Sequence, residues 1–225
     1  MIARLILSTI AVVCSLTGAA GAQTETCDVT SGPESFEFEH YVAEQRPQEA
    51  ERFRQDSDRV SRQADRLRLR LDDGRTTELA DCPHGVAAHI YLYERYDEIG
   101  RFFVVRQLAF KDFSYTLVMS ATGRTITVYG TPIWSPDKSR FLTVACSWYP
   151  PRGSLTLHMR ANGGVTQEAE IALPTCLDES ENCTARWDNP SWIAVSCVRM
   201  DGSSRKGSEF VVMRGHDGVW KTFGR

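Results

Sequence analysis

The chain has 225 residues, of which 42% are hydrophobic and 24% are charged, and its formal net charge at pH 7 is −3. This composition is ordinary for a folded globular protein, and it argues against a disordered chain and against an integral membrane protein. The mildly acidic balance provides no general attraction to nucleic acid or to an anionic membrane surface, so we expect no nucleic-acid partner.

The first 22 residues have the pattern of an export signal. Arg4 supplies a positive charge, the apolar stretch Leu5–Leu16 follows, and Ala20-Gly21-Ala22 is a small-residue cleavage site. We therefore predict a Sec-type signal peptide over residues 1–22 and a periplasmic or secreted bacterial protein. The apolar stretch is shorter than the roughly 20 residues of a membrane-spanning helix, so we expect no stable membrane insertion after leader removal. An uncleaved anchor is the alternative.

A polar arm and one helix are expected next. Residues 23–47 have the composition of an extended arm, and the charged segment 48–65 is rich in helix-forming residues. Pro47 suits the first turn of such a helix. Four apolar residues follow at steps of seven, four and three, a spacing that places them on one helix face: Phe53, Val60, Ala64 and Leu67.

The remaining chain has the pattern of short β-strands. Leu67–Leu71 alternates strictly between apolar and charged residues, Asp72-Asp73-Gly74 is a turn, and Arg75–Cys82 is predicted to return as the second strand of a hairpin. Apolar runs separated by turn residues continue to the C-terminus, which indicates a single mainly β domain over residues 48–225. These runs are His89–Tyr96, Phe102–Phe110, Tyr115–Met119, Thr125–Tyr129, Phe141–Cys146, Ser154–Met159, Ala169–Leu173, Trp192–Cys197 and Phe210–Met213.

A weak internal repeat runs through these strands. A Met that ends an apolar strand is followed closely by a turn glycine at Gly123, Gly163 and Gly218, and Gly74 is a looser copy. Two similar blocks lie between the hairpins, Trp134–Cys146 and Trp187–Cys197. The glycines are separated by about 40 to 55 residues, a spacing that matches the blades of a β-propeller.

The segment Trp134–Phe141, WSPDKSRF, resembles the W-S-P-D-G turn of WD40-like repeats in periplasmic propellers of the TolB type. The longer segment Tyr115–Cys146 is similar to a block of exported bacterial proteins in which a T-G-R hairpin precedes G-x-P-x-x-S-P-D. Lys138 replaces the Gly of the turn, and Asp188-Asn189-Pro190 replaces Ser-Pro-Asp in the second block.

This resemblance implies an architecture and no chemistry. The expected fold is an irregular or incomplete β-propeller-like set of antiparallel sheets with one N-terminal helix, and a β-sandwich is the alternative. In blades of this type the Ser-Pro-Asp turn is structural, because Pro presets φ and Asp caps backbone amides. Trp134 and Trp187 are then expected to pack between blades.

Six of the seven cysteines lie outside the leader, which contains Cys14. An even number of cysteines in an exported chain is typical of disulfides formed in an oxidising compartment. We expect three bridges, with the connectivity left open. The pairing considered joins Cys176 to Cys183 around a polar loop, Cys27 to Cys82, and Cys146 to Cys197. The cysteines show no metal-ligand spacing, so no metal site is predicted.

The sequence contains no motif of a known catalytic or phosphate-binding site: no H-E-x-x-H, no G-x-S-x-G, no Walker loop and no G-x-G-x-x-G after a strand. We therefore predict no catalytic residues and no cofactor. An exported hydrolase that cleaves glycan or peptide through a carboxylate pair remains the alternative, because the sequence singles out no pair.

Trp148 and Tyr149 are the candidate binding residues. They precede Pro150-Pro151 in a predicted loop, and aromatic residues on exposed loops favour contacts with partners or sugars. The leading hypothesis is a periplasmic, disulfide-bonded binding or interaction module without catalysis, whose partner is an envelope protein or a glycan. A third hypothesis is an envelope scaffold or an enzyme inhibitor.

Overall fold

The computed structural model describes residues 35–83, 88–109, 113–145, 153–161, 164–173, 181–201 and 204–224. Within these ranges the protein is mainly β, with one helix and four antiparallel sheets. Helix α1 spans Ser35–Gln55. The first sheet contains β1 (Val60–Gln63), β2 (Arg66–Arg70) and β3 (Thr76–Ala80), and the second contains β4 (His89–Asp97), β5 (Phe102–Ala109), β6 (Phe113–Met119) and β7 (Thr125–Val128).

The third and fourth sheets have four strands each. The third contains β8 (Ile133–Trp134), β9 (Arg140–Ala145), β10 (Ser154–Ala161) and β11 (Gly164–Ala172). The fourth contains β12 (Glu181–Asn189), β13 (Trp192–Asp201), β14 (Ser204–Arg214) and β15 (Trp220–Gly224). In every sheet, strands that are consecutive in the sequence are neighbours, so each sheet is a simple meander.

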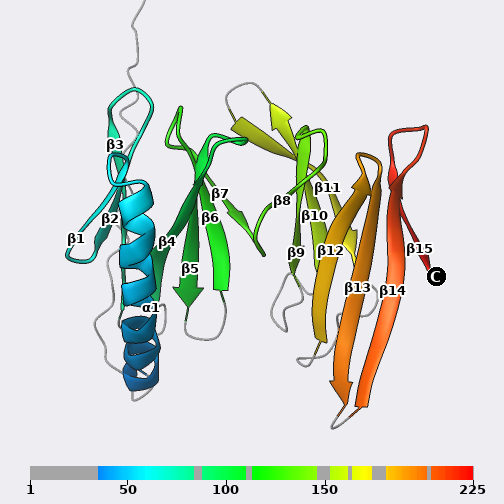
Figure 1. Ribbon diagram of the computed structural model, residues 1–225, viewed down its shortest axis with the longest axis horizontal. Helices are drawn as coiled ribbons and strands as arrows, with labels where there is room; N and C mark the ends of the chain where they lie inside the picture. The colour runs from blue at the N-terminus through cyan, green and yellow to red at the C-terminus, as the bar shows by residue number, and fades with distance from the viewer. Residues whose placement is uncertain are drawn as a thin grey trace, which may run out of the picture.

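The four sheets follow one another across the molecule in chain order (Figure 1). The first sheet and α1 lie at one end, and β12–β15 lie at the other. The expected mainly β class is therefore confirmed. The alternative, a β-sandwich of two sheets, is not observed, because the strands form four sheets.

Each pair of adjacent sheets encloses its own apolar layer. Leu67 and Leu69 of β2 pack against Phe103 and Val105 of β5, and the alternate residues of β5, Phe102 and Val104, turn to the third sheet. A strand whose two faces are both covered needs a continuous apolar run, which explains the sequence of β5. The layer between the third and fourth sheets contains Leu142, Leu155, Leu157, Leu173, Ile193, Val195, Phe210 and Val212.

The internal repeat predicted from the turn glycines corresponds to the sheets. Gly74, Gly123 and Gly218 lie in the hairpins that join the last two strands of the first, second and fourth sheets, and all three have positive φ, at 84°, 74° and 78°. A left-handed backbone conformation at these positions is what selects glycine. Gly163 lies outside the described residues.

The helix is present, but its predicted bounds are wrong. It begins at Ser35, inside the segment expected to be an extended arm, and ends at Gln55. Pro47 lies in the helix interior and has no N–H to donate to the Ala43 carbonyl oxygen four residues earlier. The helix tolerates this loss because Ala43 is exposed to water. Val60 begins strand β1, and Ala64 takes a φ of 54° in the β1–β2 turn. Phe53, Val60 and Leu67 share one core cluster without sharing a helix.

The predicted strands all contain observed strand residues, and four further strands were not predicted: β1, β8, β12 and β15. The helical spacing of Val60 and Leu67 concealed β1, and β8 is only two residues long. Neither β12 nor β15 contains an apolar run: polar residues separate Cys183, Ala185 and Trp187 in β12, and Lys221 and Thr222 are adjacent in β15. These gaps in the prediction matter, because β12 and β15 are the two edges of the last sheet.

Candidate functional site

The two ends of the row of sheets present very different surfaces. On the outer face of the first sheet every residue is exposed, and most are polar or charged: Ser61, Gln63, Arg66, Arg68, Arg70, Thr76, Glu78 and Ala80. Glu78 receives hydrogen bonds from Arg68 at 2.7 Å and Arg66 at 3.2 Å, and these bonds, with Arg68 first, lower its pKa. Such a face is suited to water, as the terminal unit of a stacked fold requires.

The outer face of the last sheet is apolar at its centre. Strand register places Trp192 beside Met213, and Ala194 beside Val211, which is itself beside Phe223. These residues alternate with Ile193, Val195, Phe210 and Val212, whose side chains pack on the third sheet. We call the face formed by Trp192, Ala194, Ser196, Val211, Met213 and Phe223 the end face. Val211 is buried among its neighbours, whereas Phe223 is 49% exposed.

A hollow lies in the end face beside β12 and β13. Its volume is about 250 Å³, and its outward-pointing lining residues are Thr184, Arg186, Ala194, Ser196 and Glu209. Ala194 and Ser196 are small, and they lie between longer side chains of the flanking strands. The hollow is therefore a consequence of small residues at the centre of β13.

Charged side chains flank the apolar centre on both edge strands. On β12, Arg186 forms an ion pair with Asp188 at 2.8 Å. At the other edge, Lys221 of β15 forms an ion pair with Asp217 at 2.9 Å. The hydrogen bond from Lys221, followed by the bond from the Val219 amide, lowers the pKa of Asp217. The end face thus has the arrangement of an interface, with an apolar centre and a polar rim.

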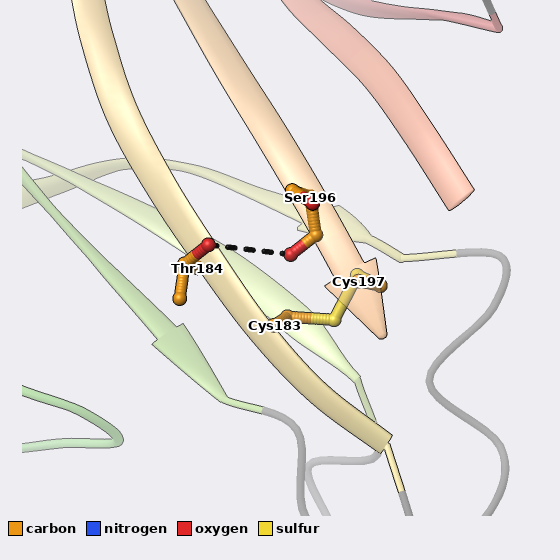
Figure 2. Close-up of a disulfide and its surroundings, with 4 residues drawn as sticks. All are labelled: Cys183, Thr184, Ser196 and Cys197. Atoms are coloured by element: carbon orange, nitrogen blue, oxygen red, sulfur yellow. Dashed lines mark hydrogen bonds between the residues drawn. A yellow bond between two sulfur atoms is a disulfide. The ribbon is translucent and has the colours of Figure 1, made fainter. Parts of the chain in front are cut away.

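A disulfide joins the first two strands of this sheet (Figure 2). Cys183 of β12 lies directly opposite Cys197 of β13, with a Cα–Cα distance of 4.0 Å, and the two sulfur atoms are bonded. In the next register pair the Thr184 hydroxyl donates to the Ser196 carbonyl oxygen at 3.4 Å. The sulfur atoms belong to the inner, core-facing side of the sheet.

This bridge corrects the predicted connectivity. The pairings of Cys176 with Cys183 and of Cys146 with Cys197 are both wrong, because Cys183 and Cys197 bond to each other. The prediction failed because β12 was not anticipated as a strand, so its register with β13 was unknown. Cys82 is also disulfide-bonded, and its partner is not one of the described residues. Pairing with Cys27 therefore stays a prediction.

The tryptophans expected to pack between sheets do so. The indole N–H of Trp134 donates to Asp97 of the preceding sheet at 2.9 Å, and that of Trp187 donates to the Ile133 carbonyl oxygen of its preceding sheet at 2.9 Å. Both residues lie on the first strand of their sheet, so the repeat between their blocks is structural.

The turn after Trp134 also matches its expected role. Asp137 accepts hydrogen bonds from the Ser135 hydroxyl at 2.6 Å and from the Ser139 amide at 3.1 Å, and these bonds, with Ser135 first, lower its pKa. Ser135 also bonds to the Arg140 carbonyl oxygen at 3.0 Å. The turn is held together by its own side chains.

Several predicted site residues cannot be placed. Trp148 and Tyr149, the candidate binding residues, lie outside the described residues, as do Cys27, Cys146 and Cys176. Their roles stay predictions.

The most buried carboxylates belong to an ionic network under α1. Glu49 accepts from Arg62 at 2.8 and 3.1 Å, and Asp81 accepts from Arg62 at 2.9 Å and from Arg46. Both also accept a backbone amide of β4, from Tyr93 and Tyr91 respectively, at 2.8 Å. Their oxygens are already engaged by guanidinium and backbone donors, so the network supports the fold. Among the residues that the structure describes, no group of three His, Cys, Asp or Glu side chains is arranged to hold a metal ion.

Sequence reasoning missed the end face. Its signal was present in Trp192, Ala194, Val211 and Met213, which alternate with the core-facing residues of β13 and β14. Strands that are apolar on both faces indicate a sheet covered on both sides, but this sheet is the last one in the chain.

Comparisons of the chain with protein families, with curated proteins and with solved structures found no match. No helix within the described ranges is long and apolar enough to cross a membrane.

Proposed function

We propose that this protein is a non-catalytic interaction module that docks a partner through the end face of β12–β15. The observation that carries the proposal is the contrast between the two ends of the molecule. The outer face of the first sheet is polar and exposed, whereas the equivalent face of the last sheet is apolar at its centre, with Phe223 exposed and Trp192 and Met213 half-buried. Apolar patches of this kind on proteins mark interaction sites.

The four sheets are, in this proposal, the blades of an incomplete, open β-propeller of WD40-like type. Three features support it: the sheets are consecutive meanders, a glycine hairpin joins the last two strands in the first, second and fourth sheets, and a tryptophan on the first strand of the third and fourth sheets bonds to the preceding sheet. An open set of blades has two end faces, and only a polar one is stable in water alone.

We further propose that the chain is exported, with residues 1–22 removed, and acts in the periplasm or outside the cell. The Cys183–Cys197 bridge supports this, because structural disulfides persist in oxidising compartments. The hydrolase hypothesis gains no support from Glu49 and Asp81, whose oxygens are engaged by arginines and backbone amides. No observation favours the scaffold or inhibitor hypothesis over a general interaction module.

Affinity capture with matched variants tests the proposed function. The exported full chain, purified and immobilised, is exposed to native periplasmic extract supplemented with its own untagged chain. Met213→Lys places a charge at the centre of the end face, and Thr76→Lys places the same charge on the polar face at the other end. We expect a component that wild type and Thr76→Lys retain and Met213→Lys loses. Equal retention by both variants would remove the end face from the function.

The predicted contribution of Trp148 and Tyr149 is tested in the same assay. If these residues extend the docking surface, replacing both by Ala weakens capture of the component that depends on Met213. Unchanged capture would show that they have no part in binding.

A further inference from the structure

We propose that the partner at the end face is a second copy of this chain, related to the first by a two-fold axis that runs parallel to the strands between β13 and β14. This inference rests on the proposed function, since it specifies what covers the docking surface. In such a dimer β13 of one copy lies over β14 of its partner, and β12 lies over β15.

The outer face of the first sheet is polar and the end face is apolar, and this difference favours contact between the end faces of two copies. A head-to-tail stack would place the apolar end face on Arg66, Arg68 and Arg70 of the next copy. That contact would remove three guanidinium groups from water, of which Arg66 and Arg68 share the single carboxylate of Glu78. Contact between two end faces instead buries apolar surface on apolar surface, and an isologous contact closes at two subunits.

The charges on the edge strands select the direction of the axis. Register places Asn189, Trp192, Met213 and Lys221 at one level across the sheet. Asp188 is the bulged residue just before Asn189 on one edge strand, where it pairs with Arg186, and Lys221 lies on the other edge strand. An axis parallel to the strands keeps each residue at its level and exchanges the edges. Asp188 of each copy then faces Lys221 of its partner, twice in the dimer.

The ion pairs within each chain add to the contact between Asp188 and Lys221 across the interface. Arg186 is paired with Asp188 and Lys221 with Asp217 within one chain. Across the interface these pairs join into a row of alternating sign: Arg186, Asp188, then Lys221 and Asp217 of the other copy. An axis perpendicular to the strands would instead place β12 on β12 and β15 on β15, so that Asp188 and Lys221 of the two copies would lie at opposite edges.

The shape of the end face supports the same two-fold axis as its charges do. The next level across the sheet is Arg186, Ala194, Val211 and Phe223. The hollow of about 250 Å³ lies at the Ala194 side of this level, and the 49% exposed Phe223 ring lies at the opposite edge. The two-fold axis therefore places the Phe223 ring of each copy over the hollow of the other, beside Arg186.

The size of the face is sufficient for a specific dimer. Four strands and four outward-facing residue levels cover about 20 by 25 Å, or roughly 500 Å² per copy before side-chain relief is counted. Two copies together bury about 1,000 Å² or more, which is the minimum for a biological interface and suits a weak dimer in equilibrium with its monomer.

Sedimentation velocity of the purified, exported full chain tests this dimer. Wild type is expected to show a monomer–dimer equilibrium. Lys221→Glu places a carboxylate opposite Asp188, and Asp188→Lys places an amine opposite Lys221, so each single variant should raise the dimer Kd by about tenfold or more. The double variant restores opposite charges and should return to within about threefold of wild type. Phe223→Ala, which removes the ring without changing charge, should also raise Kd about tenfold.

Lys138→Glu, an equal charge reversal on an exposed turn of the third sheet, is the control and should leave Kd unchanged. The proposal is overturned if wild type stays monomeric at every concentration, if the double variant is no better than the single ones, or if Lys138→Glu weakens the dimer equally. A monomeric wild type whose capture of another component still depends on Met213 would overturn only the identity of the partner. If the wild type stays monomeric and its capture of other components does not depend on Met213, the end face is not a docking surface.

Discussion

Lys138 lies at a turn position whose backbone conformation favours glycine. It takes a φ of 58° in the Ser135–Ser139 turn, a left-handed conformation that residues with a Cβ seldom adopt. Its amide still donates to the Ser135 carbonyl oxygen at 2.9 Å. The backbone therefore keeps the turn while the side chain adds strain, because a Cβ is unfavourable at this φ.

We expect Lys138→Gly to stabilise the protein. Removing the strain of the left-handed conformation stabilises the folded state by about 1–2 kcal/mol. The greater conformational freedom of Gly stabilises the unfolded chain and offsets about 0.4–1 kcal/mol of this gain. The net gain should be about 0.5–1 kcal/mol, seen in thermal unfolding as a rise of about 2 °C in Tm. Lys138→Ala keeps the Cβ and should show no gain; a gain there equal to that of Gly would contradict the argument.

His158 is a buried imidazole without polar partners. It is 4% exposed, its ring stacks on Phe141 at 4.6 Å, and neither ring nitrogen has a hydrogen-bond partner. Burial alone lowers its pKa to about 4. The native state therefore holds the neutral ring over a pH range in which the unfolded chain, with a pKa of about 6.5, takes up a proton.

The consequence is a loss of stability in acid. As pH falls from about 6.5 towards 4, the unfolded state binds the proton first, and the free energy of unfolding should decrease by about 2–3 kcal/mol at pH 4.5 because of this residue. His158→Phe keeps the ring stacking and removes the titration. We expect it to be at least as stable as wild type at pH 7, with an advantage that grows on acidification.

Denaturant unfolding at pH 7 and pH 4.5 measures the effect of His158→Phe. His216→Ala, at an exposed turn position, serves as the control and should follow wild type at both pH values. A His158→Phe advantage of equal size at the two pH values would show that the imidazole does not titrate with folding.

Among the elements, α1 protects the free edge of the second sheet. Strand β4 is an edge strand, and its outward backbone groups at Tyr91 and Tyr93 are bonded by side chains instead of another strand. Glu49 accepts from the Tyr93 amide, and Arg62 donates to the Tyr91 carbonyl oxygen. Covering an edge in this way prevents pairing with other chains.

Glu49→Ala should therefore be strongly destabilising. The carboxylate is 1% exposed and bonds Arg62, Arg46 and the Tyr93 amide. Its removal leaves the buried Tyr93 amide without its acceptor and leaves Arg62 and Arg46 with Asp81 as their shared carboxylate, at a cost of about 3 kcal/mol in the free energy of unfolding. Glu51→Ala removes an exposed carboxylate of the same helix, paired at 2.6 Å with the exposed Arg54, and should cost under about 0.5 kcal/mol. Equal costs would show that the network contributes nothing beyond surface pairing.

Disulfide mapping tests the register of the last sheet. Non-reduced peptide mass spectrometry should recover Cys183 linked to Cys197, and it should do so also in a Cys176→Ser variant. Replacing both Cys183 and Cys197 by Ala opens a loop with a sequence separation of 14 and should cost about 3 kcal/mol of stability. Recovery of Cys183 linked to Cys176 would contradict the observed strand pairing.

How much the sequence predicts depends on what defines each element. Strands β4, β5 and β6 were predictable because apolar content and turn residues mark them locally. Strand β12 was not, because it is defined by pairing with β13 in a register that becomes visible only in three dimensions. The repeat of Trp134 and Trp187 predicted packing between sheets correctly, since a repeated residue reports a repeated contact.

The end face was missed for the same reason. Its residues come from β13, β14 and β15, and their adjacency depends on strand order and on which sheet is last. From the sequence alone, Trp192 and Val211 are indistinguishable from residues of a doubly covered sheet. The disulfide pairing likewise needed the register of two adjacent strands.

At the scale of the whole molecule, four sheets form a row with unlike ends (Figure 1). The N-terminal end presents the exposed polar and charged residues of the first sheet, and the C-terminal end presents an apolar centre with a charged rim. The internal layers hold each sheet to the next. The proposed association at one face follows from this difference between the two ends.

Oxidation of two methionines tests this account most directly. Met213 lies in the end face, and Met159, which is 40% exposed, lies on β10 of the third sheet, outside the end face. The rate of sulfoxide formation at each is measured by mass spectrometry on the exported chain, at low and at high protein concentration and with any captured partner. We predict that Met213 becomes protected as the end face is covered, while Met159 oxidises at a constant rate. Equal and unchanging rates at both residues would contradict the central claim that this face is an interaction surface.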